Sequence, residues 1–277
     1  MAEPPPSAPT DEQILAFEQQ VKDREANIHP FVGEQQPLTV LQQEYEHGSE
    51  VYRVKINELD RQYRAFRRCR GDGNCFFRAF AFAWFENALL GDQAHKEATR
   101  AALVASKQLL IDAGFEWLAV EDFYDTTLEL YDQLTKATFS TAQEAVAALR
   151  ARSLEEQGAT GNAVVVHFRM VASAYLRKHA DDYLPFIEFG QTMEQYCAQH
   201  VEAFGRESEE IHIIALTKAL KVQVQVVYLD NSTANDSRVS VHTFDGQDET
   251  APSDAGEQGS TIVLLYRPGH YDILYKR

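Results

Sequence analysis

Residues 71–90, GDGNCFFRAFAFAWFENALL, decide the architecture of this chain. Gly71 and Gly73 flank Asp72 in a turn, and a strongly apolar segment begins at Cys75. This pattern predicts a glycine-rich loop that leads into a buried helix with a thiol in its first turn. Because unpaired backbone N–H groups and the helix dipole favour negative charge at that position, we expect the thiolate of Cys75 to be stabilised.

The turn itself can serve a second purpose. Backbone N–H groups around Asp72, Gly73, Asn74 and Cys75 can converge on the oxygen of a tetrahedral intermediate, and glycine lets the backbone approach closely. We therefore predict an oxyanion hole formed by these four residues. Taken alone, the segment leaves an alternative open, because a lone cysteine beside phenylalanines is often a buried structural residue.

A second chemical block lies near residue 270. His270 and Asp272 begin an alternating apolar segment after Pro268-Gly269, so they share one face of a predicted strand while Tyr271 takes the other. A carboxylate there can orient an imidazole. We therefore predict a triad in which Cys75 attacks, His270 moves protons and Asp272 holds the imidazole.

Other chemistry has little support. No cysteines or histidines fall at zinc-ligand spacing, and no phosphate-binding or dinucleotide-binding glycine motif occurs, so we expect neither a metal nor a cofactor. His212 stands among apolar residues of a predicted helix, which favours a histidine satisfied within the fold over a ligand.

Composition narrows the class of protein. The chain has 277 residues, 44% of them hydrophobic, and a formal net charge of −16, which would repel a nucleic-acid backbone. Its three cysteines, Cys69, Cys75 and Cys197, are too few for a disulfide scaffold, so we expect a reducing compartment, the cytoplasm and also the nucleus. The longest apolar run, Ala79 to Phe85, is far shorter than the roughly 20 residues of a membrane helix.

The first fifty residues differ from the body. Residues 1–10 contain four prolines and predict a disordered tail. Residues 11–28 carry a narrow apolar stripe and predict an amphipathic helix, which either docks on the body or awaits a partner. Together, residues 11–37 form a predicted arm. A helix is expected from Ser49 through Phe66, with a run of arginines, residues 61–70, as a solvated face or as a surface for acidic groups.

Beyond residue 90 helices dominate, and strands follow. Helical periodicity predicts helices over residues 95–113, 120–138, 142–152, 163–179, 192–203 and 211–220. Alternating residues predict a hairpin over 222–226 and 239–243 and two strands over 261–266 and 270–275. The fold class is therefore α+β, with a helical part packed on a small, mostly antiparallel sheet.

Three sequence blocks together resemble one enzyme family. GDGNCFFRAF (71–80), ESEEIHIIAL (207–216) and YRPGHYDILY (266–275) are similar to the signature blocks of the otubains, a branch of the ovarian-tumour-domain (OTU) cysteine deubiquitinases. The resemblance runs from about Leu38 onward, which we take as the start of the catalytic domain, residues 38–277. It is nearest to the first otubain type, because the chain has a long amino-terminal arm and an aspartate at position 272.

The resemblance implies a papain-like fold and a thiol isopeptidase that cleaves after the Gly-Gly terminus of ubiquitin, without a cofactor. Catalytic roles are implied for Asp72, Cys75, His270 and Asp272, and ubiquitin contacts for Glu209, Glu210, Ile211 and His212. Position 210 is a departure, since the family pattern has histidine there. A preference for the proteasome-directing chain linkage and non-catalytic inhibition of ubiquitin-conjugating enzymes are also implied. The expected partners are polyubiquitin and these enzymes, with a monomeric chain and with neither nucleic acid nor membrane.

Overall fold

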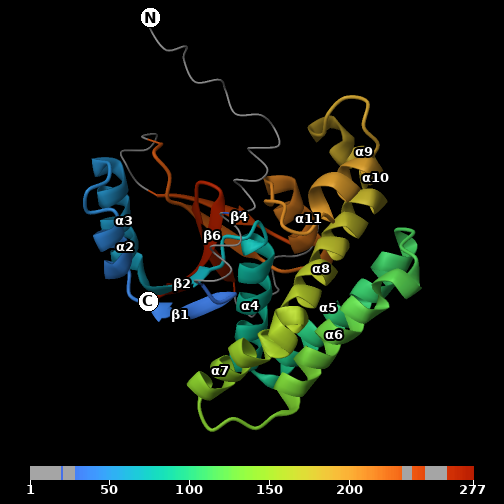
Figure 1. Ribbon diagram of the computed structural model, residues 1–277, viewed down its shortest axis with the longest axis horizontal. Helices are drawn as coiled ribbons and strands as arrows, with labels where there is room; N and C mark the ends of the chain where they lie inside the picture. Colours follow the sequence, from blue (N-terminus) through green and yellow to red (C-terminus); the bar gives the residue numbers. More distant parts are fainter. Residues whose placement is uncertain (1–19, 21–28, 233–238, 247–260) are drawn as a thin grey trace, which may run out of the picture.

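A computed structural model describes residue 20 and residues 29–232, 239–246 and 261–277 (Figure 1). The predicted tail over residues 1–10 and, apart from Gln20, the predicted helix over residues 11–28 lie outside the described residues. The described residues form one mixed sheet with helices on both of its faces, as the α+β prediction requires.

The sheet has six strands in the described part of the chain, in the spatial order β1-β2-β6-β5-β3-β4. Their bounds are Val32–Gln36 (β1), Tyr63–Cys69 (β2), Val224–Tyr228 (β3), Ser240–Phe244 (β4), Ile262–Arg267 (β5) and His270–Lys276 (β6). Every neighbouring pair is antiparallel except β3 and β5, which are parallel. The predicted hairpin is the β3–β4 pair, and the two strands predicted near residue 270 are β5 and β6.

Alternating side chains of the sheet build two separate cores. Leu264 and Ile273 face one side and join the large core that also contains the helix Cys75–Leu90 (α4). Leu265 and Leu274 face the other side and pack with the helices Thr39–Glu44 (α2) and Glu50–Gln62 (α3). Period-two alternation therefore explains why both faces of the sheet are covered.

The helical part stands on the α4 side of the sheet, with α8 running along its length (Figure 1). Its elements are Gln93–Asp112 (α5), Trp117–Lys136 (α6), Ala142–Ser153 (α7), Glu155–Lys178 (α8), Ala180–Tyr183 (α9), the 3₁₀ turn Leu184–Phe186, Met193–Tyr196 (α10), the π-helical turn Cys197–Val201 and Glu210–Leu220 (α11). Each predicted helix of this region is present, although α8 begins earlier than expected. Aromatic residues of α4 and α8, such as Phe80 and Phe168, meet edge to face in the core.

The helix that was predicted from Ser49 through Phe66 is shorter in the structure. It stops at Gln62, and Tyr63–Cys69 form β2 between β1 and β6. Local periodicity was therefore a wrong guide to residues 63–69, because strand partners from distant parts of the chain satisfy their backbone groups.

The arginines of this stretch do not form one solvated face. Arg67 is buried, where it donates to Tyr275 and forms an ion pair with Glu86, whereas Arg68 pairs with Glu44. The alternative, that the basic groups meet acidic groups of the protein itself, holds for these two residues.

The predicted domain boundary at residue 38 is also too late. Val32–Gln36 were placed in the arm, yet they pair with β2 as the edge strand β1, and Phe31 and Val32 are buried. The folded body therefore includes residues from about 29 onward, since the backbone carbonyl of His29 also accepts a hydrogen bond from Arg70.

Candidate active site

The turn before α4 has a shape that only glycine can adopt at one position. Gly73 has φ +77°, and a Cβ atom there would lie 2.0 Å from the backbone oxygen of Gly205. That contact brings the turn directly against the segment that follows the π-helical turn. Cys75 is the first residue of α4, so its thiol lies at the amino terminus of the helix as predicted. The residue is only 3% exposed.

The structure changes the roles of two residues of the predicted oxyanion hole. The backbone N–H of Asn74 donates to Oδ1 of Asp72 at 3.0 Å, so it is not free to bind an oxyanion. The carboxylate of Asp72 also forms an ion pair with Arg78 at 2.6 Å. Asp72 therefore also shapes the turn through its side chain, and the backbone amides of Asp72, Gly73 and Cys75 stay the predicted donors of the hole.

The predicted base and acid lie together at the start of β6. Nε2 of His270 is 2.9 Å from Oδ1 of Asp272. The thiol of Cys75 lies near enough to the His270 side chain to interact with it and raise its pKa. Because Asp272 engages Nε2, Nδ1 is the ring nitrogen left for the thiol. The structure thus brings Cys75, His270 and Asp272 together from α4 and β6, elements that are nearly 200 residues apart in the sequence.

Electrostatics keep the imidazole of His270 charged. Burial disfavours the imidazolium, but the hydrogen bonds and charges of Asp272 and Cys75 outweigh it and raise the pKa of His270 to about 10. A protonated imidazole in this position can stabilise negative charge on the neighbouring sulfur and later give its proton to a leaving group.

Asp272 is completely buried and accepts hydrogen bonds on both oxygens. Oδ1 accepts from the backbone N–H of Cys69 at 3.0 Å as well as from His270, and Oδ2 lies 2.5 Å from Nη2 of Arg267. Burial raises the pKa of a carboxyl group, but these partners offset it and lower the pKa of Asp272 below its ordinary value. The carboxylate therefore stays charged at the base of the site.

Arg267 is a functional residue that the sequence interpretation missed. Besides holding Asp272, it lies 3.7 Å from a carboxylate oxygen of Glu44, at the end of α2. A signal was present, because Arg267 is a charge within an apolar strand and stands directly before the Pro-Gly turn.

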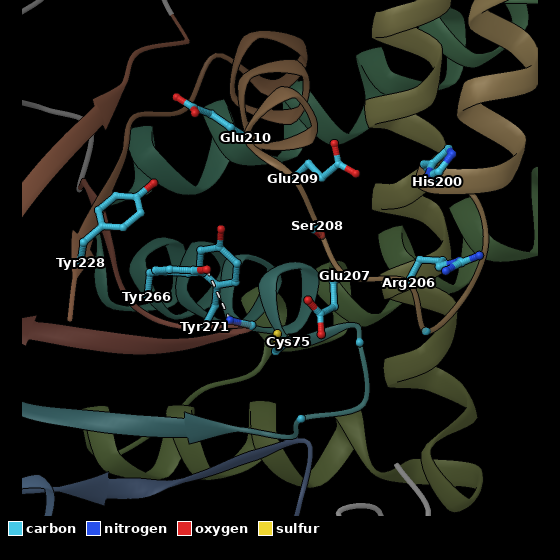
Figure 2. Close-up of a pocket in the computed structure, with 14 residues that line it drawn as sticks. Cys75, His200, Arg206, Glu207, Ser208, Glu209, Glu210, Tyr228, Tyr266 and Tyr271 are labelled. Carbon is cyan, nitrogen blue, oxygen red and sulfur yellow. Dashed lines mark hydrogen bonds between the residues drawn. The ribbon is translucent and has the colours of Figure 1, made fainter. Parts of the chain in front are cut away.

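A cleft of about 760 Å³ leads to the thiol. Tyr228, Tyr266 and Tyr271 lie on one side and Glu207 lies opposite, while Glu209 and Glu210 lie above them and the sulfur of Cys75 is at the base (Figure 2). Four glycines also line the cleft: Gly71, Gly73, Gly205 and Gly269. The cleft therefore favours an extended peptide with little side-chain bulk near the thiol and with basic groups further out.

The predicted ubiquitin-contacting residues separate into two groups. Glu209 and Glu210 are exposed and line the cleft, and Ile211 is half-buried. His212 is fully buried, so the expectation of a direct contact from His212 is wrong. Its Nδ1 accepts from the backbone N–H of Glu209 at 3.1 Å and its Nε2 lies 2.8 Å from the hydroxyl of Tyr196.

These contacts assign a structural role to His212. Burial lowers its pKa to about 3, so the ring is neutral, and Nε2 then carries the proton and donates to Tyr196. The ring thereby fixes the start of α11, from which the exposed glutamates project.

The described residues contain no group of three or more histidine, cysteine or acidic side chains placed to hold a metal ion. No helix among them is both long and apolar enough to cross a bilayer.

Comparison with known proteins assigns the family. The family model of peptidase C65, otubain, matches residues 24–276. The chain belongs to the otubain family. The match begins before β1, in agreement with the early start of the folded body.

Relatives cover almost the whole chain. Ubiquitin thioesterase OTUB1 of Homo sapiens is 38% identical over 96% of this chain and 90% of its own length. An ovarian-tumour-domain deubiquitinating enzyme of Arabidopsis thaliana is 36% identical over 92% of this chain and 84% of its own length. Human OTUB2 is 30% identical but aligns with only 81% of this chain, so the prediction of the first otubain type is confirmed.

Solved otubain structures share the fold. The structure of h/ceOTUB1 with ubiquitin aldehyde and UBCH5B~Ub superposes with a TM-score of 0.80 and 31% identity, over 96% of this chain and 98% of that chain. The corresponding complex with UBC13~Ub gives a TM-score of 0.81 and 30% identity over the same shares. The predicted OTU fold is therefore confirmed.

Proposed function

We propose that this protein is a cysteine deubiquitinase that hydrolyses isopeptide bonds after the Gly-Gly terminus of ubiquitin. The observation that carries this proposal is the contact of the Cys75 thiol with a His270 ring that is fixed by Asp272, at the base of a glycine-lined, acidic cleft. The relatives named as ubiquitin thioesterases and the neighbours that hold ubiquitin aldehyde support the same substrate.

The geometry supports a two-stage reaction. The thiolate of Cys75 attacks the carbonyl carbon of the terminal glycine, and the amides of Gly73 and Cys75 stabilise the resulting oxyanion. His270 then donates its proton to the departing lysine amine, which has a pKa near 10.4 and leaves poorly as an anion. Water, deprotonated by His270, attacks the thioester carbonyl and releases the carboxylate of ubiquitin, which restores the thiolate–imidazolium pair of Cys75 and His270.

The cleft also accounts for selection of the ubiquitin tail. The glycines that line the cleft let the backbone of a substrate approach closely, which suits a terminal Gly-Gly without side chains. The carboxylates of Glu207, Glu209 and Glu210 stand where the basic residues that precede Gly-Gly would pass. Charge attraction of this kind raises the association rate and weakens with salt.

A panel of purified diubiquitins of every linkage tests the activity. We expect the proteasome-directing linkage to be cleaved at least about tenfold faster than the others, because the preference for one linkage lies in how the second ubiquitin positions its lysine at the cleft. Cleavage is followed by gel at equal enzyme and substrate concentrations. Equal rates for all linkages would remove the linkage preference and leave the activity, whereas no cleavage of any linkage would overturn the proposed function.

A second function is favoured by the solved neighbours that contain UBCH5B~Ub and UBC13~Ub. We propose that this chain also binds ubiquitin-charged conjugating enzymes and blocks transfer without using its thiol. This binding function is also the alternative to an enzyme as the chain's main task.

The two functions respond differently to two variants. Cys75→Ser should leave inhibition of chain synthesis by a conjugating enzyme unchanged, because binding does not need the thiol. Deletion of residues 1–28, which spares β1, should relieve that inhibition while the variant still cleaves diubiquitin. Chain synthesis measured with purified enzymes decides the matter, and inhibition that disappears with Cys75→Ser would contradict a non-catalytic mechanism.

A further inference from the structure

A buried arginine behind the active site has no role in the mechanism described so far. Arg169 lies in the middle of α8, is fully buried and follows the apolar run of that helix. Burial lowers its pKa to about 10, while the nearby Cys75 and Asp72 charges oppose the shift, so the guanidinium stays protonated at neutral pH. Burying such a charge is costly unless every donor is used.

The hydrogen bonds of Arg169 end on two separate segments that line the cleft. Towards the nucleophile turn, Nη2 donates to the carbonyl of Gly73 at 3.0 Å, and Nε and Nη2 donate to Oδ1 of Asn74 at 3.1 and 2.9 Å. Towards the opposite segment, Nη1 donates to the carbonyl of Val201 at 2.8 Å and Nη2 to that of Arg206 at 2.5 Å. Among the described residues, none of these partners is a carboxylate, so the contacts organise backbone rather than neutralise charge.

The two segments also touch each other directly. The backbone N–H of Gly205 donates to Oδ1 of Asn74 at 2.9 Å, and Gly73 leaves no room for a side chain against Gly205. The second segment follows the π-helical turn Cys197–Val201 and continues into the acidic wall Glu207–Glu210. Arg169 therefore connects the turn that carries the nucleophile with the wall that faces it.

We propose that Arg169 is a positioning residue that sets the orientation of the oxyanion-binding turn. The peptide unit between Gly73 and Asn74 is held at both ends, since Arg169 binds its carbonyl and Asp72 accepts its N–H. With that unit fixed, the amides on either side of it, those of Gly73 and Cys75, keep one direction. The inference rests on the proposed function, because the oxyanion exists only during acyl transfer.

Arg169→Lys tests the role, because lysine keeps the positive charge but presents a single nitrogen that cannot span four acceptors. We expect kcat for diubiquitin to fall by about 10²- to 10³-fold, as when an oxyanion donor is lost, while KM stays within about threefold. Alkylation of Cys75 by chloroacetamide forms no oxyanion, so its rate should stay within about threefold of the wild type. If Arg169 only stabilised the fold, its replacement would lower kcat and the alkylation rate together.

Arg177→Lys is the matched control on the same helix. Arg177 forms an ion pair with Glu202 of the same segment at 2.6 Å and has no hydrogen bond to the nucleophile turn among the described contacts. It should keep kcat within about twofold. If Arg169→Lys leaves kcat within about threefold, or lowers kcat and the alkylation rate equally, the inference is overturned.

Asn74→Ala provides a second route if Arg169→Lys shows no cooperative thermal unfolding. It removes the side-chain acceptor shared by Arg169 and Gly205 and should lower kcat with little change in KM or alkylation. Where both variants fold, the double variant should be scarcely worse than Arg169→Lys, because the two act through one contact. An unchanged kcat in Asn74→Ala overturns the inference. A wild-type protein that cleaves no diubiquitin would instead overturn the proposed function, and this inference with it.

Discussion

Cys75→Ala is expected to abolish diubiquitin cleavage, with a loss of at least about 10⁴-fold in kcat, because no other group of the site can form the thioester. A ubiquitin probe with an electrophilic tail should label the wild type at one residue, identified by peptide mass spectrometry. Cys69 and Cys197 are buried, and burial raises the pKa of Cys69 well above its ordinary value and that of Cys197 to about 11. Neither thiol is therefore suited to attack.

The controls are Cys69→Ala and Cys197→Ala, which should keep cleavage and labelling. Labelling of either residue in the Cys75→Ala variant would contradict the assignment. Cys69→Ala keeps the backbone N–H that donates a hydrogen bond to Asp272, so this variant tests the Cys69 thiol alone.

The same nucleophile has a predictable pH dependence. Because the pKa of His270 is raised to about 10, the imidazolium that stabilises the thiolate is present at pH 6 and is lost only as the pH rises through about 10. In His270→Ala that cation is missing. Its chloroacetamide alkylation at pH 6 should be slower than in the wild type by more than about tenfold, and the difference should shrink above pH 9.

Asp272→Asn carries the second large expected effect, a loss of about 10²- to 10⁴-fold in kcat. Its two oxygens accept three hydrogen bonds, from His270, the backbone of Cys69 and Arg267. An amide has only one acceptor oxygen, so its NH₂ group must face either the Arg267 guanidinium or the other two donors. An asparagine at position 272 therefore cannot satisfy all three donors at once, although an asparagine can orient a histidine where fewer donors meet it.

Three measurements separate this cause from general unfolding. KM should change little, and Arg267→Gln combined with Asp272→Asn should recover part of the lost kcat, because glutamine can accept from the new amide. Stability should also depend on pH. The lowered pKa of Asp272 makes its stabilising contribution present above pH about 4 and lost as the pH falls through the folded-state value, so the variant and wild type should converge in acid. A kcat within about threefold of the wild type in Asp272→Asn would contradict the arrangement.

The parts of the fold that could be predicted are those with strong local patterns. The length and apolarity of Cys75–Leu90 allow only a buried helix, and the alternation after Gly269 places His270 and Asp272 on one face. The triad could be predicted from these two patterns, because a thiol at a helix start and an imidazole beside a carboxylate are typical of a cysteine hydrolase.

The parts that could not be predicted depend on distant partners. Tyr63–Cys69 has a helix-compatible pattern, and pairing with β1 and β6 makes it a strand. The hydrogen bond of His212 to Tyr196 and the four acceptors of Arg169, which range from Gly73 to Arg206, come from distant parts of the chain. A single arginine in the apolar stretch of α8 was the signal available, and it indicates a buried charge without identifying its partners.

The order of the strands sets when activity can arise during synthesis. β6 lies between β2 and β5, although it follows both in the chain, so the two halves of the sheet stay unjoined until residues 270–276 have been added. Those residues also carry His270 and Asp272. A growing chain thus has its thiol for some two hundred residues before the groups that activate it, and it becomes a hydrolase only when the sheet closes. The order of synthesis and folding therefore restrains the nucleophile until the chain is nearly complete.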